Sequence, residues 1–466
     1  MKGNREFAIH LNPSPIICSI TSLTMSNKSL LVILFIISFA THFAFFGDPN
    51  QTVFDEVHFG KFISSYYTGE YSFDIHPPLG KLVVAGFAKL FSFKPEFSFA
   101  KIGDKFPDSS YLSLRFLPSL AGTILPLMIF LIALEIGLSI RASFLAGFFV
   151  SIENALLSQT RFILMDAFLL LFGFASLLLY LKSKHKNSNI KYLLGTGVLG
   201  GLAISIKWTG LTFLALPFLI ESFHAFKNGT PKNIFRLILF FSIIPTIVYF
   251  SIFCLHFSLL TKPGQGDGFM RPGFQNDNIF KKFTDLNKEM YQSNKRLTAT
   301  HPYSSQWFTW PMMTRPIFYW VDSNPSEASP QVSSRIYSIG NPAIWWSSTI
   351  AVMTAILILA CNLFLKKKIP LDNRYSIFIL LGGYALNLLP FIGIKRIMFL
   401  YHYLTALIFA ILILIYLIDK NKNSGKIFAG LTIIAIIAFI YFSPLTYGLP
   451  LTAQSYENMV WFQSWK

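Results

Sequence analysis

The chain has 466 residues, of which 53% are hydrophobic and only 13% are charged, and its mean hydropathy is +0.52. This composition excludes a soluble globular protein of such length, so most of the chain must lie in a lipid bilayer. The net charge of +17 does not indicate a nucleic-acid partner, because the lysines and arginines are concentrated in short loops between apolar runs. Such a distribution is a topology signal.

The chain begins with a polar stretch, 1–28, that we expect to be a short cytoplasmic leader. It holds scattered lysines and arginines but no small-residue cleavage pattern after an apolar core, so it does not resemble a signal peptide. Met25 is an alternative start of the protein.

Eleven apolar runs follow the leader, and each is a candidate membrane-spanning helix. A bilayer core of roughly 30 Å needs about 20 apolar residues per helix. The runs are 29–47, 111–137, 142–157, 162–181, 192–206, 209–226, 234–260, 343–365, 375–392, 397–418 and 427–442. The expected fold class is therefore an all-α polytopic membrane protein with about 11 transmembrane helices.

With a cytoplasmic N-terminus, every inside loop is basic, as the positive-inside rule requires. These loops hold Lys182, Lys184, Lys186, Lys191, Lys227, Lys232, Arg236, Lys366, Lys367, Lys368, Arg374, Lys420, Lys422 and Lys426. The same orientation places all eight tryptophans at or beyond the outer ends of helices. Interfacial aromatic belts normally occur on both sides, so this asymmetry indicates an outer working face.

Two long segments, 48–110 and 261–342, remain outside, and long loops are usually functional. The first contains two apolar patterns at helical spacing, 59–67 and 79–90, which are too short to span and are expected to lie on the membrane surface. Alternatively, they only plug the top of the bundle. The expected units are the leader 1–28, an N-terminal transmembrane catalytic module 29–260 that includes loop 48–110, the large outer loop 261–342, C-terminal helices 343–442 and an outer tail 443–466.

An acidic pair, Asp55 and Glu56, opens the first outer loop immediately after the first span. Lipid-borne and water-borne substrates could meet there, and one carboxylate could accept the proton of an attacking hydroxyl while the other orients the acceptor. The competing interpretation is an N-terminal cap on the following surface helix, because Asp is favoured at that position. The sequence favours the two about equally.

A second polar cluster runs from Asp74 to Lys81 and contains the paired prolines Pro77 and Pro78. Prolines can begin the next helix, and His76 and Lys81 could then face a phosphate or a sugar. The simpler interpretation of this segment by itself is a rigid turn.

Five charged residues lie near the outer ends of spans, where an ionisable group is costly and usually has a partner or a function. They are Arg115, Glu153, Arg161, Asp166 and Lys207. Arg161 and Asp166 could pair with each other and only lock helices together. Arg115 and Lys207 have no counter-charge nearby in the sequence, and a phosphate is a suitable partner for such cations.

The second outer loop and the tenth span carry the last candidates. The loop holds His301, Tyr303 and Arg315 among aromatic residues that could stack on a sugar or bind a phosphate. For Trp307 and Trp310 an interfacial belt is the preferred interpretation. Positive charge outside, at Lys395 and Arg396, departs from the topology rule, and an anionic lipid head would explain it.

These segments together resemble the protein O-mannosyltransferase family. The match covers about residues 48–403, and its core is the Asp-Glu motif, 54–61, followed by the His-Pro-Pro-Leu-Gly-Lys motif, 76–81, in the family's order and spacing. Supporting matches are 154–158, Arg161, Asp166, 205–210, 301–305, 340–342 and 401–404. The resemblance implies a GT-C-type membrane fold and transfer of mannose from dolichyl or polyprenyl phosphate mannose to Ser/Thr hydroxyls of proteins.

The resemblance also implies roles for individual residues. Asp55 corresponds to the catalytic base, Glu56 to its neighbour in the acceptor pocket and Arg115 to an essential arginine near the lipid phosphate. Charge and position add Lys207, His301 and Arg396 as donor-binding candidates. His76, Lys81, Arg161, Asp166 and Tyr303 are candidates for acceptor contacts or support.

The large outer loop differs from that of the eukaryotic members of the family, which usually carry a β-trefoil MIR domain there. The segment 261–342 is too short for one. We therefore expect the shorter architecture and a bacterial plasma membrane, with the endoplasmic reticulum as the alternative. Acceptor choice and oligomeric state are left open.

The expected reaction is an inverting transfer in which Asp55 takes the proton of the acceptor hydroxyl and cations hold the departing phosphate. Neither a metal nor another cofactor is expected, because the sequence has no convincing ligand set and its three cysteines lie far apart. The nearest alternative is a GT-C enzyme that glycosylates a glycolipid or a cell-wall glycan. A transporter or flippase is a third possibility. The sequence shows no paired broken helices, which argues against it.

Overall fold

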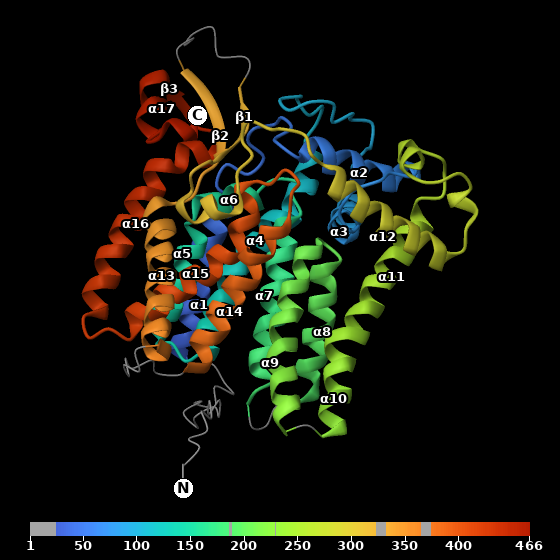
Figure 1. Cartoon of the computed structure of the whole chain (residues 1–466). Coiled ribbons are helices and arrows are strands. Elements are labelled where there is room, and N and C mark those ends of the chain that lie inside the picture. The colour runs from blue at the N-terminus through green and yellow to red at the C-terminus, as the bar shows by residue number, and fades with distance from the viewer. Residues whose placement is uncertain (1–24, 186–188, 229, 323–331, 365–373) are drawn as a thin grey trace.

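The computed structural model describes residues 25–185, 189–228, 230–322, 332–364 and 374–466. Long apolar helices form a bundle, and shorter helices with a small sheet form a cap across one of its ends (Figure 1). The cap is the expected outer face, because the basic connection between α9 and α10 lies at the opposite end of the bundle (Figure 1). Residues 1–24 of the expected leader and the lysines Lys186 and Lys366 to Lys368 fall outside the described residues. The expected end of the leader at residue 28 is wrong, because α1 already begins at Met25.

The bundle is built from helices that match the apolar runs of the sequence. They are α1 Met25–Phe43, α4 Tyr111–Glu135, α5 Ile140–Ser151, α6 Asn154–Thr160, α7 Asp166–Lys182, α8 Ile190–Ile204, α9 Thr212–Asn228, α10 Pro231–Ile238, α11 Ile244–Leu259, α13 Pro342–Phe364, α14 Arg374–Leu388, α15 Leu404–Asp419 and α16 Ser424–Tyr447. In the described part of the chain, seven are long and apolar enough to cross a membrane, or eight if the bent pair α5 and α6 is one span, and α1 and α8 are shorter apolar helices. The membrane fold is confirmed, and the total of eleven spans stays a prediction.

The run 142–157 is not the single helix that we expected. It divides into α5 and α6, which are bent by 59° relative to each other. Glu153 begins the second helix by accepting the Leu156 N–H at 2.7 Å, and its other carboxylate oxygen accepts the Asn341 N–H at 2.7 Å. The break therefore ties the bundle to the loop that precedes α13.

The cap consists of α2 Glu56–Thr68, α3 Leu79–Ala88, α12 Ile279–Arg296, α17 Ala453–Met459 and a sheet of strands β1 Ile317–Val321, β2 Val332–Ser338 and β3 Pro450–Thr452. The two amphipathic patterns of the first outer loop are indeed helices, α2 and α3, and Figure 1 shows them lying across the ends of the spans. The sheet was not expected. Its order is β1-β2-β3 with antiparallel pairs, and Ile317 lies opposite Ser338 and Val332 opposite Thr452.

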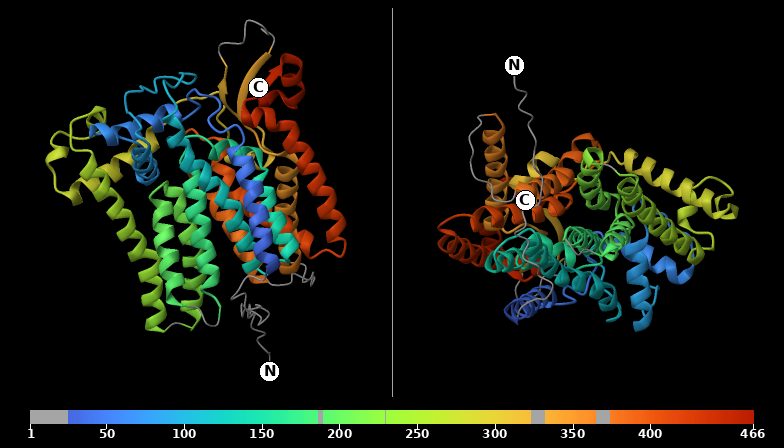
Figure 2. Two further views of the ribbon diagram at one scale, coloured as in Figure 1. Left: turned by 180° about the vertical axis from the view of Figure 1, so that it is seen from behind. Right: turned by 90° about the horizontal axis from the view of Figure 1, so that it is seen from below.

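The core runs from the bundle into the cap. α15 lies at its centre and nearly all of its side chains are buried, whereas α16 packs on the outside of the bundle (Figure 2). Trp310 and Trp345 are fully buried, and the Trp345 indole N–H donates to the Trp310 carbonyl at 2.9 Å. The expectation of an interfacial belt is therefore wrong for Trp310, because its ring is part of the core that joins the cap to the bundle.

Candidate active site

A cavity of about 750 Å³ opens where the bundle meets the cap, between α7, α9, α12 and the segment that joins α14 to α15. This volume is within the roughly 300–1,000 Å³ typical of small-molecule sites. Part of the wall is apolar, with Leu169, Leu211, Ala215, Leu386, Pro390, Phe391 and Ile394. The polar part brings together four residues that the sequence analysis singled out from distant segments: His76, Asp166, Lys207 and Arg396. The cavity thus offers a surface for a hydrocarbon chain beside a surface for an anion.

Asp55 is not one of the lining residues of this cavity, but it lies close enough to the wall residues Asp166 and Lys207 to interact with their charges. It precedes α2 as the N-cap residue, but its side chain makes no capping hydrogen bond, and among the described residues the carboxylate has no hydrogen-bond or ion-pair partner. Burial raises the pKa of Asp55 to about 6, with His58 and Lys207 opposing the rise and Asp166 and Asp74 adding to it. The capping interpretation is therefore not supported. A free carboxylate whose pKa approaches neutrality suits a general base.

Phe54, the residue before Asp55, packs against aromatic side chains of β1 and of the segment that precedes α15. The Phe54 ring stacks on Tyr319 of β1 at 4.1 Å and meets the edge of Tyr401 at 6.3 Å. The Phe54 N–H donates to the Tyr319 carbonyl at 3.1 Å, which fixes the backbone beside Asp55. β1, absent from the sequence expectation, therefore holds the acidic motif in place.

Asp166 and Lys207 form a buried ion pair on the cavity wall. The Lys207 ammonium donates to both carboxylate oxygens of Asp166 at 2.9 Å. The Gln159 amide N–H also donates to Asp166 at 2.7 Å, and the Tyr319 hydroxyl donates to the Gln159 amide oxygen. Lys207 has no counter-charge nearby in the sequence, but the fold supplies one in Asp166, 41 residues away. The suggested pairing of Asp166 with Arg161 is wrong.

Arg396 is the cavity cation with unused donors. Its guanidinium donates to the side-chain oxygen of Asn294 and contacts the His402 imidazole nitrogen at 3.2 Å. A guanidinium has five N–H donors, so three have no partner in the described part of the chain and are available to a ligand. Lys295 and Lys395 also line the cavity. This arrangement supports the anion-binding role predicted for Arg396.

His76 and Lys81 occupy different places although they belong to one motif. His76 lines the cavity, and burial together with the cations Lys207, Arg396 and Lys81 holds the pKa of its imidazole well below the usual range. Lys81 is buried behind it, where its ammonium donates to the Asp74 carboxylate and, at 3.0 Å, to the His76 carbonyl. His76 can therefore contact a ligand directly, whereas Lys81 supports the loop.

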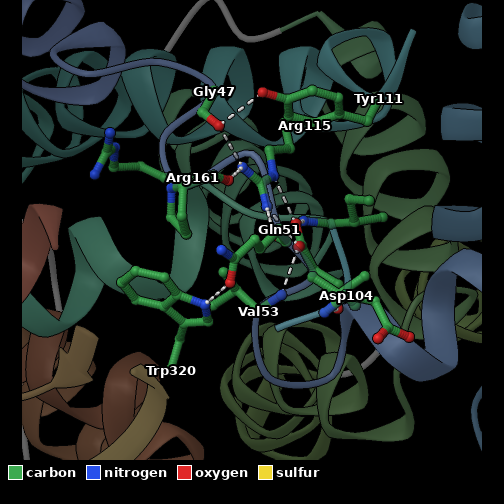
Figure 3. A network of polar contacts seen from close by, with 12 residues as sticks. Gly47, Gln51, Val53, Asp104, Tyr111, Arg115, Arg161 and Trp320 are labelled. Atoms are coloured by element: carbon green, nitrogen blue, oxygen red, sulfur yellow. Dashed lines mark hydrogen bonds and ion pairs between the residues drawn. The ribbon is translucent and has the colours of Figure 1, made fainter. Parts of the chain in front are cut away.

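Glu56 and Arg115 are engaged with each other and with the backbone, contrary to the roles expected for them. Arg115 donates to Glu56 at 2.8 and 2.7 Å and to the carbonyls of Gly47, Pro49 and Gln51 at 2.7–2.9 Å, which uses all five of its N–H donors. Glu56 also accepts the N–H groups of Val53 and Ile163, each at 2.9 Å. Figure 3 shows the Arg115 side chain enclosed by Gly47, Gln51 and Tyr111. Neither residue has a free group for a substrate, so this geometry assigns them to the framework of the first outer loop.

The remaining candidates lie outside the cavity wall. Arg161 is buried and donates to the carbonyls of His42, Ala44 and Phe45 at the end of α1, and its guanidinium stacks on Tyr447 at 4.4 Å. His301 is exposed and packs against Phe399, and Tyr303 stacks on Phe318. The donor-binding role predicted for His301 therefore has no support from the cavity.

Three residues that hold the polar side chains of this site in place were not identified from the sequence: Gln159, Asn294 and Tyr319. Gln159 directly follows a matched motif, which was a usable signal, whereas Asn294 and Tyr319 lie in segments without one. Among the described residues, no group of three or more His, Cys, Asp or Glu side chains could hold a metal ion. Independence from metal nevertheless stays a prediction.

Comparison with known proteins gives matches to two family models. Residues 32–261 match the family model described as dolichyl-phosphate-mannose-protein mannosyltransferase, and residues 279–465 match the model of the C-terminal four TMM region of protein-O-mannosyltransferase. Dolichyl-phosphate-mannose–protein mannosyltransferase 1 of Candida albicans is 32% identical over 302 residues, which are 61% of this chain and 34% of that protein. Protein O-mannosyltransferase 1 of Drosophila melanogaster is 35% identical over 258 residues, 52% of this chain and 29% of that protein.

The matched region thus spans about a third of the length of these curated relatives. Among solved structures, the S. cerevisiae protein O-mannosyltransferase Pmt1-Pmt2 complex bound to the sugar donor superposes with a TM-score of 0.88 and 20% identity. The superposition covers 96% of this chain and 93% of that chain. The expected GT-C fold is therefore confirmed.

Proposed function

The chain belongs to the protein O-mannosyltransferase family, and from this premise we propose that it transfers mannose from polyprenyl (dolichyl) phosphate mannose to Ser/Thr hydroxyls of proteins at the outer membrane face. The observation that carries the proposal is the unoccupied carboxylate of Asp55 beside a cavity with apolar and cationic walls. The name of the Candida albicans relative states a dolichyl phosphate mannose donor and a protein acceptor, and that of the Drosophila melanogaster relative states a protein acceptor.

The cavity suggests how a lipid-linked sugar would lie. Its hydrocarbon chain would follow the apolar wall at α9 and α14, and its phosphate would meet Arg396 and His76. The sugar would then point toward Asp55. Because Lys207 is neutralised by Asp166, the anion-binding charge comes from Arg396 with Lys295 and Lys395.

In the proposed step, the acceptor oxygen forms a bond to the anomeric carbon while the bond from that carbon to the phosphate oxygen breaks. The bonding electrons leave with the phosphate, and Asp55 takes the hydroxyl proton. Attack from the face opposite the phosphate inverts the anomeric configuration. The phosphate gains a second negative charge, which nearby cations stabilise more strongly than the single charge of the donor.

The test is transfer of radiolabelled mannose from polyprenyl phosphate mannose to a Ser/Thr-containing peptide by the purified chain in membranes. Label should enter the peptide and not its Ser/Thr→Ala counterpart. Label in an added glycolipid acceptor alone would overturn the protein acceptor and favour the alternative GT-C activity. Lipid transport without any sugar transfer would favour a flippase.

The pH dependence of transfer should report the raised pKa of Asp55. A base works only when deprotonated, so kcat/KM should be level above pH about 6 and fall about tenfold per pH unit below it. The measurement is initial rates between pH 4.5 and 8 with a check that activity returns on readjustment to pH 7. A profile that stays level to pH 4.5 would show that no group with this pKa is the base.

We further propose that transfer needs no metal, because the phosphate of the donor is a leaving group that protein cations can stabilise. Incubation with excess EDTA, followed by removal of the chelator, should leave the rate within about twofold of the untreated enzyme. Loss of activity that added Mg²⁺ or Mn²⁺ restores would contradict this.

The protein is a multi-pass membrane protein, but the membrane in which it resides is a separate question. The relatives named above are eukaryotic, so they give no support to the expected bacterial plasma membrane. We keep the bacterial plasma membrane and the endoplasmic reticulum as alternatives, which fractionation of the native host would separate. Oligomeric state stays open.

A further inference from the structure

The C-terminal part of α12 forms the roof of the cavity. Tyr291, Asn294 and Lys295 line the cavity from this helix, which lies across the end of the bundle beside α2 (Figure 1). Earlier in α12, Leu286 and Met290 are buried in the core shared with α11. The part of α12 around Leu286 and Met290 is thus packed in the core, whereas its C-terminal part covers the cavity.

Asn294 joins this roof to both polar walls of the cavity. Its side-chain oxygen accepts a hydrogen bond from the Arg396 guanidinium, and its amide nitrogen donates at 2.9 Å to the carbonyl of Ile75, the residue before His76. Close by, the Ile397 N–H donates to the Leu297 carbonyl at 3.2 Å. One side chain therefore links the segment that carries Arg396 to the loop that carries His76.

An amide suits this position better than a carboxylate. A neutral amide oxygen orients the guanidinium and leaves its positive charge available to an anion, whereas a carboxylate would pair with Arg396 and compete with that anion. The amide also supplies an N–H for the Ile75 carbonyl, which a carboxylate lacks. Asn294 can thus place a cation and a neutral imidazole on opposite sides of one ligand group.

We propose that Asn294 is a positioning residue that holds Arg396 and the His76 loop in register for the phosphate of the lipid-linked donor. The proposal rests on the proposed function for the identity of the ligand, and it concerns binding of the phosphate rather than proton transfer. The Asn294 side chain bonds to Ile75, Met290 and Arg396 and not to Asp55, so its replacement should change donor affinity and leave the base intact.

The experiment compares Asn294→Ala and Asn294→Asp with wild type in the full-length protein. Asn294→Ala should raise the KM for polyprenyl phosphate mannose about tenfold with kcat changed less than threefold, the scale of one hydrogen bond to a charged group. Asn294→Asp should be worse, because the new carboxylate neutralises Arg396. The matched control is Asn287→Ala, two turns earlier on α12, where the amide bonds to Tyr249 and the Phe283 carbonyl and does not line the cavity. Its KM should match that of wild type.

Direct binding of polyprenyl phosphate, which carries no sugar, separates this proposal from the proposed function. If the wild-type protein binds the lipid phosphate but transfers no mannose, the proposal that the donor carries mannose is overturned. Weaker binding of the lipid phosphate by Asn294→Ala would still support the positioning role. Unchanged binding and KM in both Asn294 variants, or a lowered thermal unfolding temperature with unchanged KM, would overturn the role. Equal loss of affinity in Asn287→Ala would also overturn it, because the effect would then belong to the whole helix.

Discussion

Asp55→Asn should lower mannosyl transfer by a factor of about 10² to 10⁴, the usual contribution of a positioned general base. The carboxylate lies beside the cavity with no hydrogen-bond partner among the described residues, so its replacement breaks no contact of the fold. Asparagine keeps the shape and removes only the ability to take a proton. The KM for the lipid donor should therefore remain within about threefold of wild type.

Asp108→Asn is the matched control for this prediction. Asp108 is an exposed loop residue whose carboxylate accepts the Ser110 N–H at 2.8 Å, a bond that an asparagine oxygen can also accept. Its transfer rate should equal that of wild type. A rate for Asp55→Asn within threefold of wild type, with both variants folded, would show that another group takes the proton.

Glu56→Gln should destabilise the protein strongly, and this separates the two members of the acidic motif. The exposed fractions of the Glu56 and Arg115 side chains are 0% and 1%, and breaking a buried pair of this kind leaves an uncompensated charge that costs about 3–5 kcal/mol. The amide keeps one acceptor oxygen, so it can accept from Val53 or from Ile163 but not from both. Its NH2 group would then face N–H donors, which adds to the loss caused by the unpaired charge of Arg115. The expected result is a markedly lower thermal unfolding temperature and poor yield of folded protein.

The control here is an exposed ion pair, Lys466 with Glu457, whose side chains are 48% and 51% exposed. Glu457→Gln should change the unfolding temperature little, because exposed pairs contribute less than about 1 kcal/mol. Thermal unfolding in detergent, measured alongside transfer per folded molecule, distinguishes the possible roles. Full stability of Glu56→Gln with lost transfer would restore the catalytic role that the sequence indicated.

The spans could be predicted because lipid imposes a local rule on the sequence. Each stretch of backbone in the bilayer must satisfy its own hydrogen bonds as a helix, so hydropathy alone located every described bundle helix. The break at Glu153 was missed because the polar interruption is short and its partner, the Asn341 N–H, lies far away in the chain. The sheet was missed because its strands are short and because β3 lies far along the chain from β1 and β2.

The site could be predicted only as a set of candidates. Asp55 was identifiable because an acidic pair follows the first span, where a carboxylate could take the proton of an acceptor hydroxyl, and because the motif order resembled one family. The adjacent Glu56 has the same chemistry and nearly the same position in the sequence, yet its carboxylate is fully occupied. No local pattern distinguishes the free acid from the bonded one.

The sequence by itself determined the membrane class, the basic inner loops, the family and the acidic motif, because composition, hydropathy and motif order are properties of neighbouring residues. Only the tertiary structure decided which charges are free. Arg115 meets Glu56, Lys207 meets Asp166 and Arg396 meets Asn294 across 59, 41 and 102 residues of chain. Whether a buried charge binds a substrate or supports the fold depends on such distant partners, because burying a charge without a partner costs a large desolvation free energy.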